Sequence, residues 1–199
     1  MTAIGETLAV LGLPATHEAV LLDYAGLFRK WNQRINLSAA RTEHELHDHI
    51  TDCLHLVPHL GTTEQTVVAP RLLDVGAGGG LPGIVVAICM PDAHIVSLEP
   101  VHKKHAFLRT AARELSLINL DARAERLDDH AGHDYAAAMS RATFDLREWL
   151  LLGLNRVAPG GEVFGFEALQ RDDLPPETRR YPYAHLDKSR AIVTLRRPT

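Results

Sequence analysis

Residues Leu72 to Ile84 read LLDVGAGGGLPGI and hold five glycines within eight positions, directly behind an apolar run that ends in Asp74. Glycine costs more backbone entropy on folding than any other residue, so such a cluster indicates a tight turn or a backbone that approaches a ligand closely. Three kinds of ligand fit this pattern at first sight: a dinucleotide, a nucleoside triphosphate, and an adenosyl group that carries no phosphate.

Two registers of the glycines have different meanings. Gly78, Gly80 and Gly83 satisfy the G-x-G-x-x-G pattern of dinucleotide-binding loops. Counting from Gly76, the first residue after the apolar run, gives G-x-G-x-G instead, the form seen in enzymes that use S-adenosylmethionine (SAM). A P-loop is excluded because no Gly-Lys-Ser/Thr follows, and a ligand-free turn is disfavoured because a strand and a helix flank the loop.

Two carboxylates stand where such a ligand would lie. Glu99 ends the next apolar run and could accept hydrogen bonds from both ribose hydroxyls, which would serve NAD and SAM equally. Asp74 precedes the glycines, where it could meet a methionine ammonium group or order the loop through backbone N–H groups. An aspartate there would repel the pyrophosphate of NAD, so Asp74 favours SAM.

Arginines follow the third and fourth apolar runs of the chain's C-terminal part, which begins at Arg71. Arg123-Ala124-Glu125 follows the third run, where backbone and carboxylate could recognise adenine. Ser140-Arg141 follows the fourth, where a methyl acceptor would lie, and Arg141 could hold a phosphate or the edge of a guanine. A surface ion pair without function is the alternative for both arginines.

The histidines do not form a recognised metal motif. His44 and His47 are three positions apart, so H-E-x-x-H is absent, and because no third ligand is specified we expect no metal site. Four other histidines are expected at the surface: His102, His105, His130 and His133. A basic cluster around Trp31 could follow a phosphate backbone or simply be a solvated helix end: Arg29, Lys30, Arg34 and Arg41.

The elements that must position these residues follow from the apolar pattern. Strands are expected at 71–75, 94–99, 120–124, 135–140, 162–166 and 191–196, with helices at 82–90, 103–115 and 146–154. Two helices, 16–32 with Thr16 as N-cap and 42–60, come first, and Pro159-Gly160-Gly161 is expected to form a turn. Strands that alternate with helices predict an α/β fold whose sheet is mostly parallel, with the last strand antiparallel.

Composition narrows the class of protein. The 199 residues are 46% hydrophobic, enough for one well-filled core. Two cysteines, no apolar stretch of eighteen residues and no signal peptide predict a cytoplasmic protein without disulfides or membrane spans. The net charge of −4, with twelve neutral histidines, means that any contact with nucleic acid must depend on a local basic patch.

Several segments in this order and spacing resemble one family: KWNQRINLS, HITDC, LLDVGAGGGLPGI, VSLEPVHKKHAFLR, ARAE and MSRA. It is the glucose-inhibited division protein B family, also called RsmG, whose members methylate a guanine N7 of small-subunit (16S) ribosomal RNA near the decoding site. The resemblance implies a class I SAM-dependent methyltransferase fold of seven strands. It further implies an N-terminal helical extension over residues 1–61 and a SAM-binding domain over 62–199.

The resemblance also implies roles for individual residues. It places SAM against Asp74, Gly76, Ala77, Gly78, Gly80 and Leu81, its ribose on Glu99, and its adenine beside Arg123, Ala124 and Glu125. Arg141 becomes the catalytic residue between cofactor and acceptor, and S-adenosylhomocysteine the product. Residues that would face RNA are Asn36, Arg41, His49, Lys103 and Lys104.

One departure from the family pattern concerns the acceptor side. The strand after Pro159-Gly160-Gly161 ends in Glu167-Ala168, where the family usually has Lys-Gly, and this charge reversal questions an RNA contact there. The expected partner is the small ribosomal subunit or its assembly precursor, bound by a monomer. The alternatives are a SAM-dependent methyltransferase with another acceptor, a non-catalytic SAM- or RNA-binding module, and an NAD-linked oxidoreductase.

Overall fold

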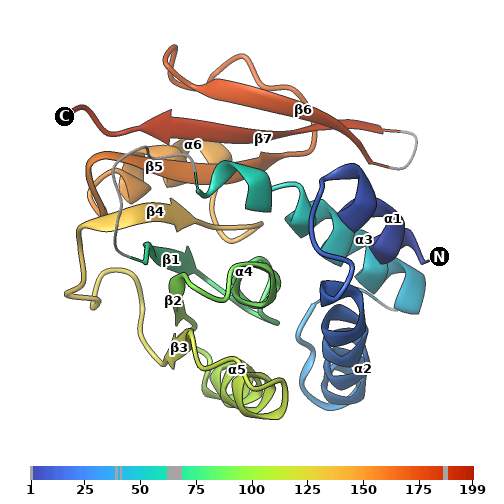
Figure 1. Ribbon diagram of the computed structural model, residues 1–199. Helices are drawn as coiled ribbons and strands as arrows, with labels where there is room; N and C mark the ends of the chain where they lie inside the picture. Colours follow the sequence, from blue (N-terminus) through green and yellow to red (C-terminus); the bar gives the residue numbers. More distant parts are fainter. Residues whose placement is uncertain (1, 39, 41, 62–68, 186–187) are drawn as a thin grey trace.

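A computed structural model describes residues 2–38, 40, 42–61, 69–185 and 188–199 (Figure 1). Seven strands form one sheet in the order β3-β2-β1-β4-β5-β7-β6. The strands from β3 to β5 are parallel, and the last strand, β7, runs antiparallel to both of its neighbours. The predicted fold class is therefore confirmed, including the direction of the last strand.

The elements have the following bounds. The strands are β1 Arg71–Val75, β2 His94–Leu98, β3 Leu120–Arg123, β4 Tyr135–Met139, β5 Val157–Glu167, β6 Arg179–His185 and β7 Lys188–Arg196. The helices are α1 Ala3–Val10, α2 His17–Ile35, α3 Glu43–Leu54, α4 Gly83–Cys89, α5 His102–Glu114 and α6 Leu146–Gly153, with a 3₁₀ turn at Val57–His59.

Two buried clusters cover the two faces of the sheet. On one face, Leu72 of β1 packs in the same cluster as α4, α5 and the N-terminal helices. On the other face, Leu73 and Val75 pack with Trp149 and Leu150 of α6. Alternate residues of β1 thus point to opposite layers, as the period of a strand buried on both faces requires.

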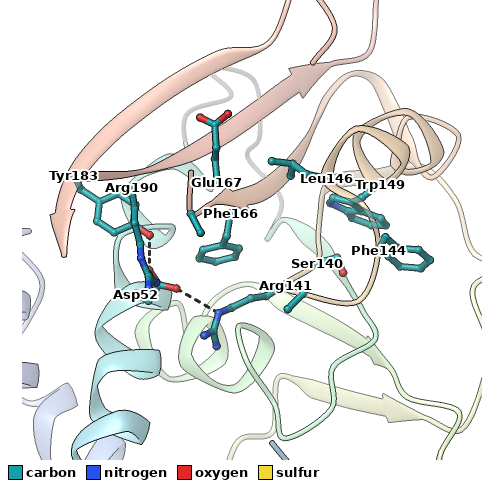
Figure 2. A pocket seen from close by; sticks show the side chains of 12 residues that line it. Asp52, Ser140, Arg141, Phe144, Leu146, Trp149, Phe166, Glu167, Tyr183 and Arg190 are labelled. Carbon is teal, nitrogen blue, oxygen red and sulfur yellow. Dashed lines mark hydrogen bonds and ion pairs between the residues drawn. The ribbon is translucent and has the colours of Figure 1, made fainter. Parts of the chain in front are cut away.

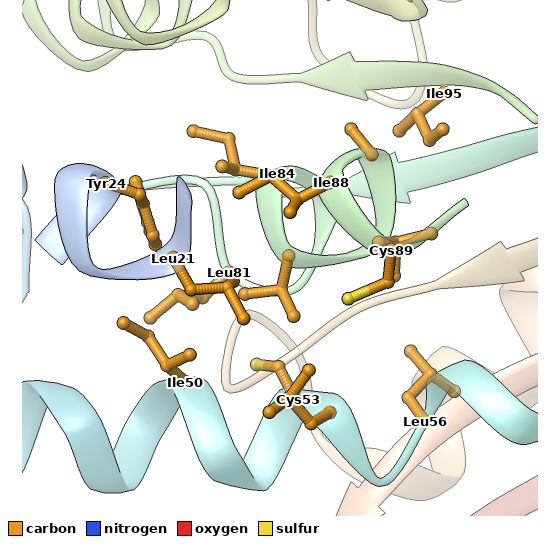
Figure 3. Packing of buried hydrophobic residues seen from close by; sticks show 14 of the residues in the cluster. Leu21, Tyr24, Ile50, Cys53, Leu56, Leu81, Ile84, Ile88, Cys89 and Ile95 are labelled. Atoms are coloured by element: carbon orange, nitrogen blue, oxygen red, sulfur yellow. The ribbon is translucent and has the colours of Figure 1, made fainter. Parts of the chain in front are cut away.

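The N-terminal helices share the core of the sheet domain. Leu81 and Cys89 lie on the side of α4 that faces Ile50 and Cys53 of α3, and Tyr24 of α2 lies near the start of α4 (Figure 3). All four apolar side chains are buried, and so is Tyr24. The position of the N-terminal helices is thus fixed by hydrophobic burial, while the division of the chain at residue 61 stays a prediction.

The predicted N-terminal helices differ in detail from those observed. Thr16 stands at the N-cap position of α2, as predicted, but its backbone is already helical and its side chain makes no capping hydrogen bond. Asn36 takes a left-handed conformation (φ 52°) and ends α2 there. The predicted helix 42–60 stops at Leu54, and Pro58, which has no N–H to donate, lies in the separate 3₁₀ turn. The sequence also predicts a linker over residues 61–70, of which residues 62–68 lie outside the described part of the chain.

The C-terminal part corrects two further expectations. Pro159-Gly160-Gly161 does not form a turn between elements, because β5 runs through it with a shift in its pairing to β4. Gly160 has φ +78° and donates its N–H to the Arg197 carbonyl, so the glycine permits a bulge inside the strand. The segment expected as a polar loop before β7 contains β6, whose arginines and Pro182 concealed it.

Across the part of the chain that the structure describes, no helix combines the length and apolar character needed to cross a bilayer.

Replacing Tyr24 by phenylalanine tests how α2 holds the glycine loop. The buried Tyr24 hydroxyl donates to the Gly79 carbonyl at 2.6 Å, so Tyr24→Phe leaves that carbonyl without its donor. We expect the free energy of unfolding in urea to fall by about 1–3 kcal/mol. In Tyr181→Phe, the control, the lost hydroxyl makes no hydrogen bond within the described residues, and a change within about 0.5 kcal/mol is expected. Equal losses in both variants would contradict this role of Tyr24.

Candidate active site

The predicted site residues meet at the carboxyl edge of the parallel strands. Register pairs Asp74 of β1 with Ser97 of β2 and with Met139 of β4, and pairs Leu98 of β2 with Arg123 of β3. The loops that follow these strands carry the glycines, Glu99, Glu125 and Arg141. Ligands of open α/β sheets bind at this edge, so the topology brings the candidates to one crevice.

The glycine loop is folded tightly onto the end of β2. The N–H groups of Gly76 and Ala77 both donate to the Leu98 carbonyl at 3.0 Å. Gly76, Gly78 and Gly80 all have positive φ, at +72°, +55° and +90°. These three are the glycines of the register that begins at Gly76, so in this register every glycine has a conformation that other residues adopt rarely.

Gly78 is the glycine beside which a ligand has room. A Cβ built on it would have no neighbour nearer than 3.8 Å, whereas a Cβ on Gly76 would overlap Thr143 and one on Gly79 would overlap the Phe28 ring. The loop is therefore packed tightly against protein at Gly76 and Gly79, while a Cβ at Gly78 would only touch the Gly76 and Leu37 carbonyl oxygens. Leu81, at the end of the loop, is buried.

Asp74 lies beneath the loop. Its Oδ2 accepts a hydrogen bond from the Ser97 hydroxyl at 3.1 Å, and the backbone of Gly83 at the start of α4 also binds the carboxylate. The other oxygen, Oδ1, is buried and has no partner among the described residues. The Asp74 carboxylate thus links β2 to the start of α4, and it is fully buried.

Glu99 joins the glycine loop to α5. Its Oε2 accepts from the Gly78 N–H and its Oε1 from the Val101 N–H, both at 2.8 Å. The side chain is almost fully buried. Each carboxylate oxygen can accept a second hydrogen bond, so Glu99 can hold the loop and still receive ribose hydroxyls.

The adenine-side segment is held by ion pairs. Arg123, partly exposed, pairs with Asp121 at 2.9 Å, which is the surface pair considered above as the alternative to ligand contact. Glu125 accepts from His130, whose ring also contacts the Tyr135 hydroxyl at 2.8 Å. His130 is buried, so its expected place at the surface was wrong: its ring is enclosed because both nitrogens have polar partners. Ala124 between the two charged residues is exposed.

Arg141 lines a cavity of about 280 Å³ at the end of β4 (Figure 2). Its Nε lies 3.3 Å from Oδ2 of Asp52 on α3, and its guanidinium carbon lies 6.0 Å from the centre of the Phe166 ring. Arg190 and Tyr183 bind the same carboxylate from β7 and β6. The aromatic lining of the cavity comes from Phe144, Trp149 and Phe166.

Glu167 lines the same cavity, but its charge is neutralised. Its carboxylate accepts from Arg180 Nε at 3.0 Å and from the backbone N–H of Arg171 at 2.9 Å. In Figure 2 the carboxylate points away from Arg141 and Phe166. The departure from the family's Lys-Gly pair therefore does not place an uncompensated negative charge beside Arg141.

The residues expected to face RNA are only partly assembled. Asn36 and Lys103 are exposed, and Lys104 is half-buried. His49 is half-buried, and burial together with the nearby Arg141 lowers its pKa. Arg41 lies outside the described residues, and Arg29 of the basic cluster is paired with Glu43.

The sequence patterns did not single out several cavity residues. Asp52 was quoted only as part of HITDC, and nothing marked its carboxylate as the partner of an arginine far along the chain. Phe166 stands at the end of a predicted strand, whereas Tyr183 and Arg190 stand outside the predicted strands, so no pattern indicated the cavity that they line. Among the described residues, no group of three histidine, cysteine or acidic side chains is arranged to hold a metal ion.

The pH dependence of stability tests the burial of Asp74. Burial raises the pKa of Asp74 to about 7, from about 3.9 in an unfolded chain. Between these values the native state keeps a proton that the unfolded state has released, so the contribution of Asp74 to stability falls as the pH rises. We expect the stability of Asp74→Asn relative to the parent to increase from pH 4 to pH 7, by a few kcal/mol at most.

Urea unfolding at several pH values measures this difference. Asp92→Asn removes an exposed aspartate at the opposite edge of the sheet, and its profile should run parallel to that of the parent. A constant difference between Asp74→Asn and the parent from pH 4 to pH 7 would show that the Asp74 carboxylate is not held in a desolvated place.

Solved structures with a similar fold include a SAM-dependent O-methyltransferase from Thermotoga maritima. It is 11% identical with a TM-score of 0.57, covering 74% of this chain and 65% of that one. A tRNA (m1A58) methyltransferase from Aquifex aeolicus is 13% identical with a TM-score of 0.55, over 74% and 68%. At these identities the likeness establishes the fold alone, the fold of SAM-dependent methyltransferases.

Comparison of sequences identifies the family. A ribosomal RNA small subunit methyltransferase G from Burkholderia pseudomallei (strain 1106a) is 39% identical over 200 residues, which cover 93% of this chain and 85% of the relative. One from Burkholderia mallei (strain NCTC 10229) is also 39% identical, over 93% and 86%. The family model for rRNA small subunit methyltransferase G matches residues 17–194. This chain therefore belongs to the rRNA small subunit methyltransferase G family and is a SAM-dependent methyltransferase.

Proposed function

We propose that this protein transfers the methyl group of SAM to N7 of a guanine in 16S ribosomal RNA near the decoding region, leaving S-adenosylhomocysteine. The observation that carries the proposal is the position of Arg141, at a cavity beside the glycine loop, in a chain of this family. The relatives, which are ribosomal RNA small subunit methyltransferases G, support the choice of substrate.

The residues that would hold SAM are those around the open side of the loop. Gly76, Ala77, Gly78, Gly80 and Leu81 supply the backbone surface, and the unpartnered Oδ1 of Asp74 supplies an acceptor below it. Glu99 would take the ribose, and Arg123, Ala124 and Glu125 would border the adenine. When bound, SAM supplies a methyl group on a positively charged sulfur.

The chain has no proton to remove in this reaction. Guanine N7 carries an in-plane lone pair and no hydrogen, so no side chain needs to act as a general base. The work of the protein is to align the base with the methyl group and to exclude water, and such positioning supplies on the order of 7–11 kcal/mol in favourable cases.

The cavity suits a base that has been turned out of its stack. Phe144 and Phe166 offer ring faces, and the Nε1 of Trp149 is already satisfied by the Phe164 carbonyl at 2.7 Å. Aromatic faces of this kind hold unstacked bases in RNA-binding proteins. Arg141 can donate to guanine O6 from its terminal nitrogens, because its ion pair with Asp52 is made through Nε.

The local charges favour a base edge over a phosphate for Arg141. Arg141 and Arg190 share the carboxylate of Asp52, and Arg180 is paired with Glu167. Two arginines and two carboxylates line the cavity, so the lining carries no net charge, which suits a charge-assisted hydrogen bond from Arg141 to a neutral acceptor. Because Glu167 is paired with Arg180, its negative charge gives no reason to prefer a methyl acceptor other than RNA.

The proposal extends to the partner and the setting. Asn36, Arg41, His49, Lys103 and Lys104 would contact the RNA around the target base, on the small subunit or its assembly precursor. The protein would act as a monomer in the cytoplasm, with residues 1–61 as an extension of the SAM-binding domain.

Substitutions at Arg141 and Glu99 should separate turnover from cofactor binding. Arg141→Ala is expected to lower methyl transfer by about 10²-fold, through loss of alignment, with the Kd for S-adenosylhomocysteine nearly unchanged. Glu99→Ala should raise that Kd by about tenfold or more, because it removes the ribose acceptors and releases Gly78. Tritiated methyl transfer and calorimetry measure the two effects.

Exposed partners on α5 provide matched controls. Arg113→Ala and Glu114→Ala remove the same side-chain types from a surface pair and should leave both quantities within twofold. A collapse of cofactor affinity in Arg141→Ala would mean that Arg141 holds the cofactor. Normal affinity in Glu99→Ala would contradict the placement of the ribose.

The decisive assay uses small ribosomal subunits from a strain that lacks the modification. Transfer of labelled methyl to these subunits, with the product mapped to N7 of one guanine, is the expected result. Binding of S-adenosylhomocysteine without transfer to any subunit or precursor would favour a non-catalytic module. Binding of NAD in its place would favour the oxidoreductase.

A further inference from the structure

Asp52 is a buried carboxylate that receives donors from three distant segments. Its side chain is 3% exposed. The Tyr183 hydroxyl donates to Oδ1 at 2.5 Å and Arg190 Nη1 at 2.8 Å, while Arg141 Nε approaches Oδ2 at 3.3 Å (Figure 2). One carboxylate of α3 therefore joins the loop after β4 to both strands of the C-terminal hairpin.

Asp52 and Phe166 confine the guanidinium of Arg141 between them. The carboxylate engages Nε, the inner nitrogen, and the Phe166 ring centre lies 6.0 Å from the guanidinium carbon. Arg141 is itself only 16% exposed in its side chain. The carboxylate and the ring thereby restrict the orientation of the guanidinium.

The place of Asp52 is set in turn by the hairpin. The Tyr183 ring stacks on His55, one turn further along the same segment, with ring centres 4.1 Å apart and planes at 17°. Burial and the neighbouring Asp52 carboxylate raise the pKa of Tyr183, so its hydroxyl remains a donor at neutral pH. Arg190 balances part of the buried charge, as a carboxylate removed from water requires.

We infer that Asp52 is a positioning residue for the acceptor base: it fixes Arg141, and Tyr183 and Arg190 of the hairpin fix Asp52. The inference rests on the proposed function, because it assigns to Arg141 the alignment of the base. It gives α3 and the β6–β7 hairpin a role in the reaction, which is to hold Arg141 in place. Neither the glycine loop nor the residues around the cofactor have this role.

A double-mutant cycle tests whether Asp52 acts through Arg141. Asp52→Asn keeps the shape of the side chain and removes its charge. We expect it to lower the single-turnover rate of methyl transfer to small subunits by about 10- to 100-fold. The KM for the subunit and the Kd for S-adenosylhomocysteine should stay within twofold of the parent values. In an Arg141→Ala background the same substitution should cost less than twofold more, because the residue through which it acts is already gone. Asp92→Asn is the control and should match the parent.

Tyr183→Phe provides a second route if Asp52→Asn unfolds at the assay temperature. It removes one donor to Asp52 and keeps the ring that stacks on His55. We expect a loss of about three- to tenfold in transfer, again absent in the Arg141→Ala background. Parent rates in both Asp52→Asn and Tyr183→Phe, or losses that multiply with that of Arg141→Ala, would overturn the inference.

A spectroscopic readout keeps the inference independent of the substrate. In ¹⁵N spectra of the full chain with S-adenosylhomocysteine, the Nε–H resonance of Arg141, assigned by its loss in Arg141→Lys, should be sharp and protected from solvent exchange. It should exchange at least tenfold faster in Asp52→Asn, and unchanged exchange there would overturn the positioning role. If the parent protein transfers no methyl group to the small subunit, the proposed substrate is wrong. The exchange rate of the Arg141 Nε–H then still shows whether Asp52 holds Arg141.

Discussion

The hydrogen bonds at the end of β2 are the constraint on which the site depends. The Leu98 carbonyl accepts from two successive N–H groups of the glycine loop, and the next residue, Glu99, accepts from Gly78 and from the first turn of α5. Five peptide groups beyond two parallel strands are thus tied together at one point. Since the loop has positive φ at three places, these bonds keep it in a conformation that it would otherwise leave at little cost.

The N-terminal helices and the C-terminal hairpin complete the site from opposite ends of the chain. Tyr24 and Phe28 of α2 cover the outer side of the loop at Gly79, and Asp52 of α3 reaches the acceptor cavity. The sheet itself supplies the strand ends and the glycine loop. The N-terminal helices and the C-terminal hairpin supply the side chains that pack against them. The candidate site is therefore built from segments that lie far apart in the sequence.

Much of the fold followed from the sequence because its signals are local. The register at Gly76, the strand ends at Glu99 and Arg141, and the alternation of strands with helices are each contained within short segments. What was missed depends on contacts between distant residues: β6 is polar along its length and forms because β7 pairs with it, and Pro159-Gly160-Gly161 forms a bulge because β4 and β7 flank it. Asp52 is a buried carboxylate whose partners Arg141, Tyr183 and Arg190 lie far along the chain, so no single window of sequence contains them. The partners of His130 are each only five residues away, but their spacing alone does not show that the chain folds around the ring.

The pairing of charges around the acceptor cavity has a consequence for ionic strength. Arg141, Arg190 and Arg180 each have an internal carboxylate partner that is buried, so dissolved salt screens these interactions only weakly. In the proposed reaction, exposed cations such as Lys103 would release counterions on meeting RNA, and their contribution would fall steeply with salt. Encounter with the polyanionic RNA and retention of a single base would then respond differently to ionic strength within one small protein.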